Sequence, residues 1–207
     1  MTELRIGVTT RETRHAASGD TRDAISRDWA GFIGAALPEA LWMPVPNVGP
    51  TAREYAQRWG LNGFIFTGGE DYTGRSVRDV TEKGLLELAL ENKYPVYGVC
   101  RGMQFFQIYF GGSLVECPGR SHVSARHAVT FVNTGKEERA TVNSFHRWGM
   151  RADGLAPALK PFAITDDGFV EGVNAPDNRL MATMWHPERE SPFARGDIGR
   201  LQALFLS

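Results

Sequence analysis

The residue most suited to chemistry is Cys100, within residues 97–104, Tyr-Gly-Val-Cys-Arg-Gly-Met-Gln. A short apolar run precedes the cysteine, a helical pattern follows it, and glycines stand two residues to either side. This pattern is typical of a nucleophile elbow with cysteine in place of serine, because so tight a turn has no room for a flanking Cβ. The N-terminus of the following helix would favour the thiolate. On these residues alone, a buried structural cysteine in a glycine-rich turn is an equal alternative.

A base and an orienting carboxylate are found at His186 and Glu188, directly after the apolar run 180–185. In extended chain, residues two apart point to the same side, and Pro187 would keep the pair extended and out of a helix. One imidazole nitrogen can then take the thiol proton while the carboxylate orients the other. The same three residues also occur as an ordinary surface turn.

Two further segments could bind a substrate. Phe64-Ile65-Phe66-Thr67 leads into Gly68-Gly69, so the Gly69 N–H could form an oxyanion hole with that of Arg101. The alternative is a plain strand-to-helix turn. Polar groups also follow a strand at Asn143, Ser144 and His146, where they could hold a small polar substrate. A single histidine such as His146 is more often structural than catalytic.

The first half of the chain alternates short β-branched runs with amphipathic stretches, which predicts βαβ units and a parallel sheet. We expect strands at residues 4–10, 41–46, 63–67 and 95–99, and helices at 23–37, 51–60 and 77–92 and from just after Cys100 to about Phe110. Ligands bind such sheets at the carboxyl ends of the strands. The loops to inspect are therefore 10–20, 67–75, the flanks of Cys100 and the residues after Trp185.

The second half has shorter runs, which predict strands at 127–132, 139–143, 160–165, 169–173 and 180–185. Turn signals at Asp166-Asp167-Gly168 and Pro176-Asp177-Asn178 indicate that part of this half is antiparallel or mixed sheet. A closing helix is expected at 197–206. The prediction is an α/β fold with a helix-covered, largely parallel sheet, in a single domain of residues 1–207.

The composition excludes several classes of protein. Among 207 residues, 23 Lys plus Arg oppose 24 Asp plus Glu, so the net charge of −1 gives no basic field for nucleic acid. No apolar run approaches the roughly 20 residues of a membrane span, and no signal peptide is evident, so we expect a cytoplasmic protein. Two cysteines are too few for a disulfide framework. The histidines lack a closed ligand set at metal spacing, so we expect no metal and no cofactor.

In this order, Gly-x-Cys-x-Gly-x-Gln, Asn-Ser-x-His and Trp-His-Pro-Glu resemble the class I glutamine amidotransferase-like superfamily. The branch of stand-alone gamma-glutamyl hydrolases, such as gamma-glutamyl-gamma-aminobutyrate hydrolases, is particularly similar, over nearly the whole chain. The resemblance implies a flavodoxin-like three-layer sandwich and a gamma-glutamyl thioester on the cysteine. It also implies site residues, namely the triad Cys100, His186 and Glu188, the oxyanion donors Gly69 and Arg101, and the glutamyl-binding Gln104, Asn143 and Ser144.

Two features depart from that family: the chain is shorter than the aminobutyrate hydrolases, and Arg101 stands where many members carry leucine. The motif loops also hold Arg11, Arg147 and Arg189. Such a cationic rim would suit phosphate, although surface arginines also pair readily with carboxylates such as those of Glu70, Asp71 and Glu190. Residues 28–32, 100–104 and 185–190 resemble small hydrolases of bacterial surface-polysaccharide gene clusters. One such enzyme removes glutamate from a gamma-glutamyl-CDP-amidate during capsule modification.

The leading hypothesis is a hydrolase that cleaves a gamma-glutamyl amide bond of a small molecule, with gamma-glutamyl-CDP-amidate as the specific substrate. A gamma-glutamyl-gamma-aminobutyrate-type hydrolase is one alternative. Another is the glutaminase subunit of an amidotransferase, which would deliver ammonia to a synthetase partner. The non-enzyme alternative is an inactive binding or regulatory homologue. No nucleic-acid or membrane partner is expected, and a homodimer is left open.

Overall fold

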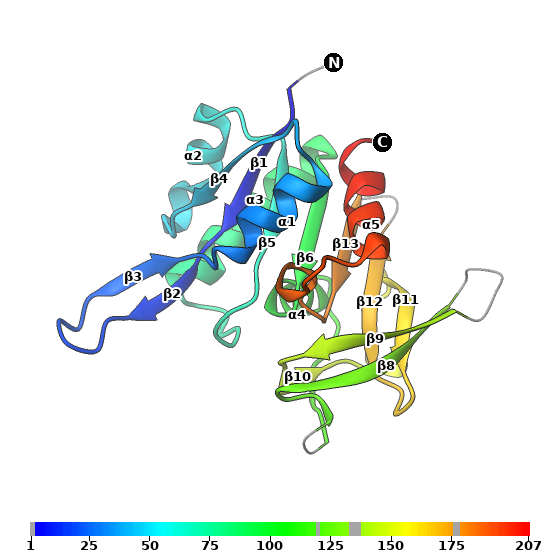
Figure 1. Ribbon diagram of the computed structural model, residues 1–207. Coiled ribbons are helices and arrows are strands. Elements are labelled where there is room, and N and C mark those ends of the chain that lie inside the picture. The colour runs from blue at the N-terminus through cyan, green and yellow to red at the C-terminus, as the bar shows by residue number, and fades with distance from the viewer. Residues whose placement is uncertain (1–2, 119–120, 133–137, 176–178) are drawn as a thin grey trace. The chain divides into compact units, whose positions relative to one another are not determined.

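The computed structural model describes residues 3–118, 121–132, 138–175 and 179–207 (Figure 1). The chain forms two compact units. One, the terminal unit, comprises Met1–Tyr97 and Pro187–Ser207; the other, the central unit, comprises Gly98–His186. The single domain expected from the sequence stays a prediction, and the turn expected at Pro176-Asp177-Asn178 lies outside the described residues.

The terminal unit contains the predicted parallel strands. β1 (Arg5–Thr9) pairs in parallel with both β4 (Leu41–Val45) and β5 (Gly63–Phe66), and the order continues to β6 (Val96–Val99), at whose middle the central unit begins. Every residue of β5 is buried, as expected for strands covered on both faces. The order β4-β1-β5-β6 is the 2-1-3-4 order of flavodoxin-like sheets.

Four helices of the terminal unit follow the apolar periodicity. They are α1 (Asp28–Ala36), α2 (Ala52–Arg58) after the 3₁₀ turn η1 (Gly49–Thr51), α3 (Val77–Asn92) and α5 (Arg195–Phe205). α1 contacts α5, and α2 contacts α3. In Figure 1, α1 lies in front of the strands of this unit and α3 behind them. In the described parts of the chain, no helix combines the length and apolar character that a bilayer crossing requires.

An antiparallel hairpin, β2 (Arg11–Arg14) and β3 (Thr21–Ala24), occupies the segment expected to be a loop and the start of a helix. Figure 1 shows it as the blue ribbon that extends from β1. The prediction of a helix from residue 23 was wrong, because α1 begins only at Asp28. The hairpin is polar on both faces, so it lacks the apolar alternation by which strands are recognised, and Gly19 (φ 74°) supplies its turn.

The central unit is antiparallel in every strand pair described. The order is β13-β12-β11-β8-β9. A core of Val129, Phe131, Val142, Ala163 and Trp185 lies within this unit. Its elements are α4 (Arg101–Tyr109), β7 (Val115–Glu116), β8 (Ala125–Phe131), β9 (Glu138–Ser144), β10 (Trp148–Gly149), η3 (Ala152–Gly154), β11 (Lys160–Thr165), β12 (Val170–Ala175) and β13 (Leu180–Thr183). The antiparallel sheet expected for the second half is confirmed; the two-residue β7–β10 pair was not predicted.

Candidate active site

Cys100 lies in a strained elbow, as the glycine spacing predicts. Its backbone has φ 52° and ψ −102°, which is unusual for a residue with a side chain. A Cβ built on Gly98 would lie 2.4 Å from Cε2 of Phe106, so only glycine fits there. The Cys100 N–H donates to the Thr183 carbonyl at 2.8 Å and ties the elbow to the end of β13. The central unit therefore fixes this cysteine through its own strand and helix.

The helix after the elbow, α4, begins at Arg101, so its first free N–H groups lie next to Cys100. Arg101 is 1% exposed, which removes it from the expected arginine rim. Gln104 Nε2 donates to the Trp148 carbonyl at 2.8 Å. Gln104 therefore joins α4 to β10 in this structure, while its expected contact with a glutamyl group stays a prediction.

The backbone of His186 is fixed by two hydrogen bonds to the side chain of Asn143. Nδ2 of Asn143 donates to the His186 carbonyl at 2.8 Å, and the His186 N–H donates to Oδ1 of Asn143 at 2.9 Å. The Phe145 ring meets the imidazole edge to face, with 5.7 Å between centroids. Ser144 Oγ donates to the His122 carbonyl at 2.6 Å. The Asn-Ser-x-His segment thus positions His186, a role that the sequence analysis did not foresee.

The extended geometry expected for His186-Pro187-Glu188 was wrong. Residues Pro187–Arg189 form a 3₁₀ turn, η5, because proline at the first position of a helical turn already has a helical φ. The argument that extended chain would place residues 186 and 188 on the same side therefore fails. Glu188 is 3% exposed in the terminal unit, and its Oε1 lies 3.7 Å from Nε of Arg189.

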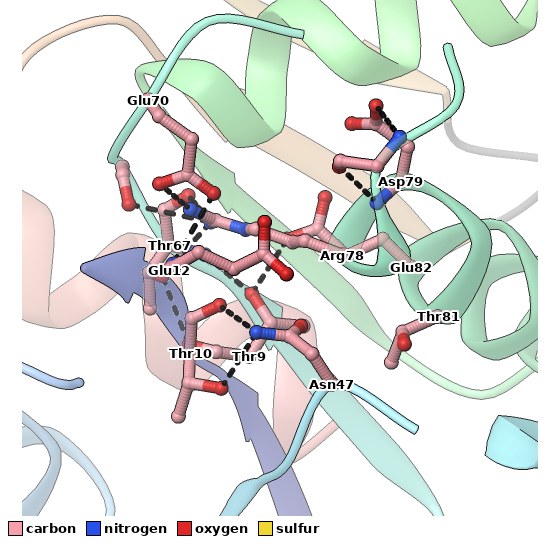
Figure 2. A network of polar contacts seen from close by, with 12 residues as sticks. Thr9, Thr10, Glu12, Asn47, Thr67, Glu70, Arg78, Asp79, Thr81 and Glu82 are labelled. Carbon is pink, nitrogen blue, oxygen red and sulfur yellow. Dashed lines mark hydrogen bonds and ion pairs between the residues drawn. The ribbon is translucent and has the colours of Figure 1, made fainter. Parts of the chain in front are cut away.

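The Gly68-Gly69 turn of the terminal unit is fastened by Arg78, a residue that the sequence analysis missed. Each guanidinium nitrogen of Arg78 donates: Nη2 to the Thr67 carbonyl at 2.7 Å, Nη1 to Glu70 at 3.0 Å and Nε to Glu82 at 2.8 Å. Figure 2 shows this side chain reaching from α3 toward the end of β5. The spacing of Arg78 and Glu82, four residues apart on one helix, was the available signal.

The polar contacts continue from Arg78 into β1. Thr9 Oγ1 donates to Glu82 at 2.9 Å and accepts from the Thr67 N–H at 3.1 Å (Figure 2). A Cβ built on Gly69 would lie 2.3 Å from Nη1 of Arg78. Glycine is needed here because the backbone has φ 154° and a buried guanidinium packs against it, reasons distinct from the predicted approach of a substrate. The oxyanion role of the Gly69 N–H stays a prediction.

The remaining arginines of the expected rim are exposed. Arg147 donates to Glu116 at 2.8 Å, so the alternative of surface ion pairing holds for this residue. Arg189 lies beside Glu188, as given above, and Arg11 is exposed on β2. Ion pairs of this exposed kind contribute little stability. The substrate-binding role expected for these arginines stays a prediction.

The second cysteine differs from Cys100. Burial, together with the nearby carboxylates of Glu171 and Asp167, raises the pKa of the Cys117 thiol to about 12. Such a thiol is inert as a nucleophile near neutral pH. Of the two cysteines, the strained Cys100 at a helix N-terminus is therefore the candidate nucleophile.

His146, expected to contact substrate, lies in a buried cluster with His122, His127 and Glu171. One ligand atom of each residue lies within 4.8 Å of the others. The argument that the histidines form no closed ligand set was therefore wrong, because antiparallel strands bring distant residues together. Burial opposes ionisation of Glu171, but its contacts with His127 and His146 outweigh that effect, so the pKa of Glu171 is lowered.

A family comparison agrees with the elbow and the motifs around it. The model of the Peptidase C26 family matches residues 5–188, most of the chain. The chain belongs to the Peptidase C26 family. This class I glutamine amidotransferase-like membership confirms the expected resemblance and the prediction of a hydrolase that acts on carbon–nitrogen bonds of amides.

Curated relatives of this Peptidase C26 chain include a protein of Schizosaccharomyces pombe described as a glutamine amidotransferase, 33% identical over 54% of the chain. The chain spans 50% of that relative's length. Gamma-glutamyl-CDP-amidate hydrolase of Campylobacter jejuni is 27% identical, over 90% of both chains. Gamma-glutamyl-gamma-aminobutyrate hydrolase of Escherichia coli O157:H7 is 27% identical, over 78% of this chain and 75% of the relative.

A solved structure supports the fold of the Peptidase C26 chain. A Thermoplasma acidophilum protein described as one subunit of GMP synthase superposes with a TM-score of 0.70. The match covers 99% of this chain and 94% of the other, at 18% identity. It confirms the predicted α/β fold with a mixed, mostly parallel central sheet.

Proposed function

We propose that this Peptidase C26 protein hydrolyses a gamma-glutamyl amide through a thioester on Cys100. The observation that carries the proposal is the strained Cys100 elbow at the N-terminus of α4. His186, whose backbone Asn143 clamps, is the proposed base, and Glu188 is the proposed orienting carboxylate. The family and the hydrolases among its relatives agree with this chemistry.

In the first half of the reaction, the Cys100 sulfur attacks the gamma-carbonyl carbon after His186 takes the thiol proton. The oxyanion receives hydrogen bonds from the proposed donors, the N–H groups of Gly69 and Arg101. The carbon–nitrogen bond then breaks, and His186 returns the proton to the leaving nitrogen. This sequence leaves a gamma-glutamyl thioester and a free amine or amidate.

In the second half, water replaces the leaving group. His186 takes a proton from the water, whose oxygen attacks the thioester carbon. The carbon–sulfur bond breaks, the sulfur recovers its proton from His186, and glutamate leaves. The balance is one water consumed for each amide cleaved, and no redox partner is needed.

For the substrate, we propose gamma-glutamyl-CDP-amidate, in the biosynthesis of capsular phosphoramidate. Support comes from the Campylobacter jejuni relative, which matches over 90% of both chains, and from the exposed arginines. A planar guanidinium donates two parallel hydrogen bonds to phosphate. Arg11 is the best candidate, because it lies on the hairpin next to the end of β1.

The deciding experiment measures glutamate release from glutamine, gamma-glutamyl-gamma-aminobutyrate and gamma-glutamyl-CDP-amidate. A kcat/KM at least 100-fold higher for the nucleotide conjugate, about 2.7 kcal/mol of discrimination, is expected. Cys100→Ser should abolish turnover of every substrate and Cys117→Ser should not. Cys100→Ser activity above about a tenth of wild type would disprove the thioester. Preference for glutamine would instead favour a glutaminase that serves a synthetase.

A matched pair of arginine variants tests the phosphate contact. Arg11→Ala should raise KM for the nucleotide conjugate at least 10-fold, about 1.4 kcal/mol, and spare gamma-glutamyl-gamma-aminobutyrate. Arg14→Ala, at the other exposed end of β2, is the control and should change neither. Equal effects of Arg11→Ala on both substrates would remove the argument for phosphate recognition.

A further inference from the structure

Four side chains of the central unit converge on one point. His127 lies on β8 and Glu171 on β12, His122 precedes β8, and His146 follows β9. Nε2 of His146 lies 3.2 Å from Oε1 of Glu171 and 3.4 Å from Nδ1 of His122. Nε2 of His127 lies 3.4 Å from Oε2 of Glu171. The side chains of His122, His146 and Glu171 are 1%, 0% and 0% exposed.

In each histidine, one ring nitrogen, the inner one, lies toward Glu171, and the other, the outer one, lies close to an oxygen that orients the ring. Nε2 of His122 lies 3.0 Å from the Asp167 carboxylate. Nδ1 of His127 lies 3.2 Å from the Ser121 carbonyl, and Nδ1 of His146 lies 3.2 Å from the Trp148 carbonyl. A carbonyl or carboxylate oxygen can only accept, so each outer nitrogen carries the hydrogen. In the neutral rings, the three inner nitrogens therefore present lone pairs to the centre.

Glu171 adds two more acceptors to that centre. Among the described residues, neither of its carboxylate oxygens accepts an aligned hydrogen bond. The histidine nitrogens are near enough, but they do not point along the lines that join them to the oxygens. Nε2 of His127 likewise has no aligned partner in the described part of the chain. Four ligand atoms that lie within 4.8 Å of one another around a buried carboxylate are arranged as the ligands of an ion would be.

We propose that His122, His127, His146 and Glu171 bind a divalent transition metal, with Zn²⁺ as the preferred ion. Three imidazoles and one carboxylate form a zinc ligand set, and Zn–N distances of about 2.05 Å give tetrahedral ligand–ligand edges of about 3.3 Å. The contacts of 3.2 and 3.4 Å match those edges. The outer oxygens complete the arrangement, since zinc-bound histidines usually donate their other N–H to such a group.

The site would act on the fold rather than on the substrate. Four protein ligands fill a tetrahedral shell, which is the arrangement of a structural zinc and not of a catalytic one. The metal would join β8, β12 and the segment after β9. His146 follows Asn143 by three residues, and Asn143 holds the backbone of His186. Metal binding would thus fix the segment that positions the proposed base, and it does not depend on the chemistry of Cys100.

The test measures zinc binding to the full chain purified without a histidine tag. After removal of metal by a chelator, Zn²⁺ is titrated against a chromophoric competitor. Wild type should bind one Zn²⁺ per chain. Glu171→Gln and His127→Gln should each lose at least about 100-fold in affinity, since even outer-shell partners are worth 10 to 100-fold. His15→Gln, at an exposed histidine of the β2–β3 hairpin, and Cys100→Ser should bind like wild type.

Two results would overturn the proposal: wild type that takes up no stoichiometric Zn²⁺ at micromolar concentration, or ligand variants that bind as tightly as wild type. The first would mean that protons satisfy the cluster. If the variants fail to fold by circular dichroism, Co²⁺ in the wild type decides. A tetrahedral nitrogen and oxygen site gives intense d–d bands without sulfur charge transfer. Weak octahedral bands, or a sulfur band from Cys117, would refute this ligand set.

Discussion

The two units each bury a polar cluster, and the two clusters are built in opposite ways. In the terminal unit, Arg78 faces oxygen acceptors, and each of its guanidinium nitrogens donates at 2.7 to 3.0 Å (Figure 2). In the central unit, three histidines lie close to Glu171, and neither oxygen of Glu171 accepts an aligned hydrogen bond from the described residues. The first cluster pairs donors with acceptors, whereas the second, when its histidine rings are neutral, gathers acceptors.

The comparison teaches that burial of charge is not by itself a sign of ligand binding. Both clusters contain fully buried carboxylates, Glu82 and Glu171. A buried charge is tolerated when it is paired and hydrogen-bonded, as Glu82 is by Arg78 and Thr9. The direction of the hydrogen bonds therefore separates the two cases. Arg78 fastens the Gly68-Gly69 turn with no added group, while the histidine cluster is completed by a cation.

The largest expected effect is from Arg78→Met, which breaks the self-contained cluster. It leaves the fully buried Glu82 without its guanidinium partner, so we expect a loss of about 3–5 kcal/mol in the free energy of unfolding. Urea denaturation measures this. Arg75→Met, at an exposed arginine just before α3, is the control and should cost less than about 0.5 kcal/mol. The double variant Arg78→Met/Glu82→Leu should recover part of the lost unfolding free energy. If it is instead as unstable as Arg78→Met, the unpaired charge of Glu82 is not the cause of the loss.

The second prediction is that added Zn²⁺ stabilises the protein through the histidine cluster and not through the Arg78 cluster. At a Zn²⁺ concentration about 100 times its Kd, binding to the native state should add about 2.7 kcal/mol and raise the Tm by about 5–10 °C. His127→Gln should lose this shift. His15→Gln should keep it, because the His15 side chain lies in the hairpin of the other unit. A zinc-dependent Tm in His127→Gln as large as in wild type would place the ion elsewhere.

The parallel half of the fold was predictable because its strands are continuous apolar runs between clear helix signals. The observed bounds of α3 equal those predicted, since Ser76 and Asp79 form a capping box at its start. The β2–β3 hairpin was not predictable by the same rule, because both of its faces are polar. The 3₁₀ turn at Pro187 was also not predicted, because proline is found at the first position of helical turns as well as after their ends.

The candidate site likewise has one part that the sequence could predict and one part that it could not. The Cys100 elbow was recognisable because its chemistry depends on local spacing, with glycines at fixed offsets. The cluster of His122 and Glu171 was hidden, because 49 residues and several antiparallel pairings separate its members. Even the role of Asn143 as a clamp on His186 depends on a contact between residues 43 apart. Long-range contacts of this kind leave no periodic signal in the sequence.

A third, smaller effect tests how tightly the Arg78 cluster packs. Gly69→Ala places a Cβ 2.3 Å from Nη1 of Arg78 at a residue with φ 154°, so the guanidinium must shift and the backbone is strained, at an expected cost of about 1–3 kcal/mol. Gly34→Ala is the control, because a Cβ there meets nothing within 4 Å and alanine favours the helix. Thermal unfolding of both variants gives the answer. Equal stability of the two would mean that Arg78 tolerates displacement without loss of its contacts.

The smallest expected effect is electrostatic and lies at the rim of the Arg78 cluster. Burial raises the pKa of Glu12 above its usual 4.5, the carboxylates of Glu70 and Asp23 raise it further, and Arg78 only partly opposes them. The folded state thus binds this proton more tightly than the unfolded state, so ionisation of Glu12 destabilises the fold as pH rises through 4.5. Glu12→Gln should therefore be more stable than wild type at about pH 7 and equal to it at about pH 4.

Water screens the partly exposed Glu12, so the gain should not exceed about 0.5 kcal/mol. Urea unfolding at the two pH values measures it, and Glu39→Gln, at an exposed glutamate of the same unit, should give no such pH-dependent difference. A Glu12→Gln gain that persists at about pH 4 could not arise from ionisation. It would instead mean that Arg78 fully offsets the effect of the surrounding carboxylates on Glu12. The charges at the edge of the Arg78 cluster would then be as well paired as the hydrogen bonds at its centre.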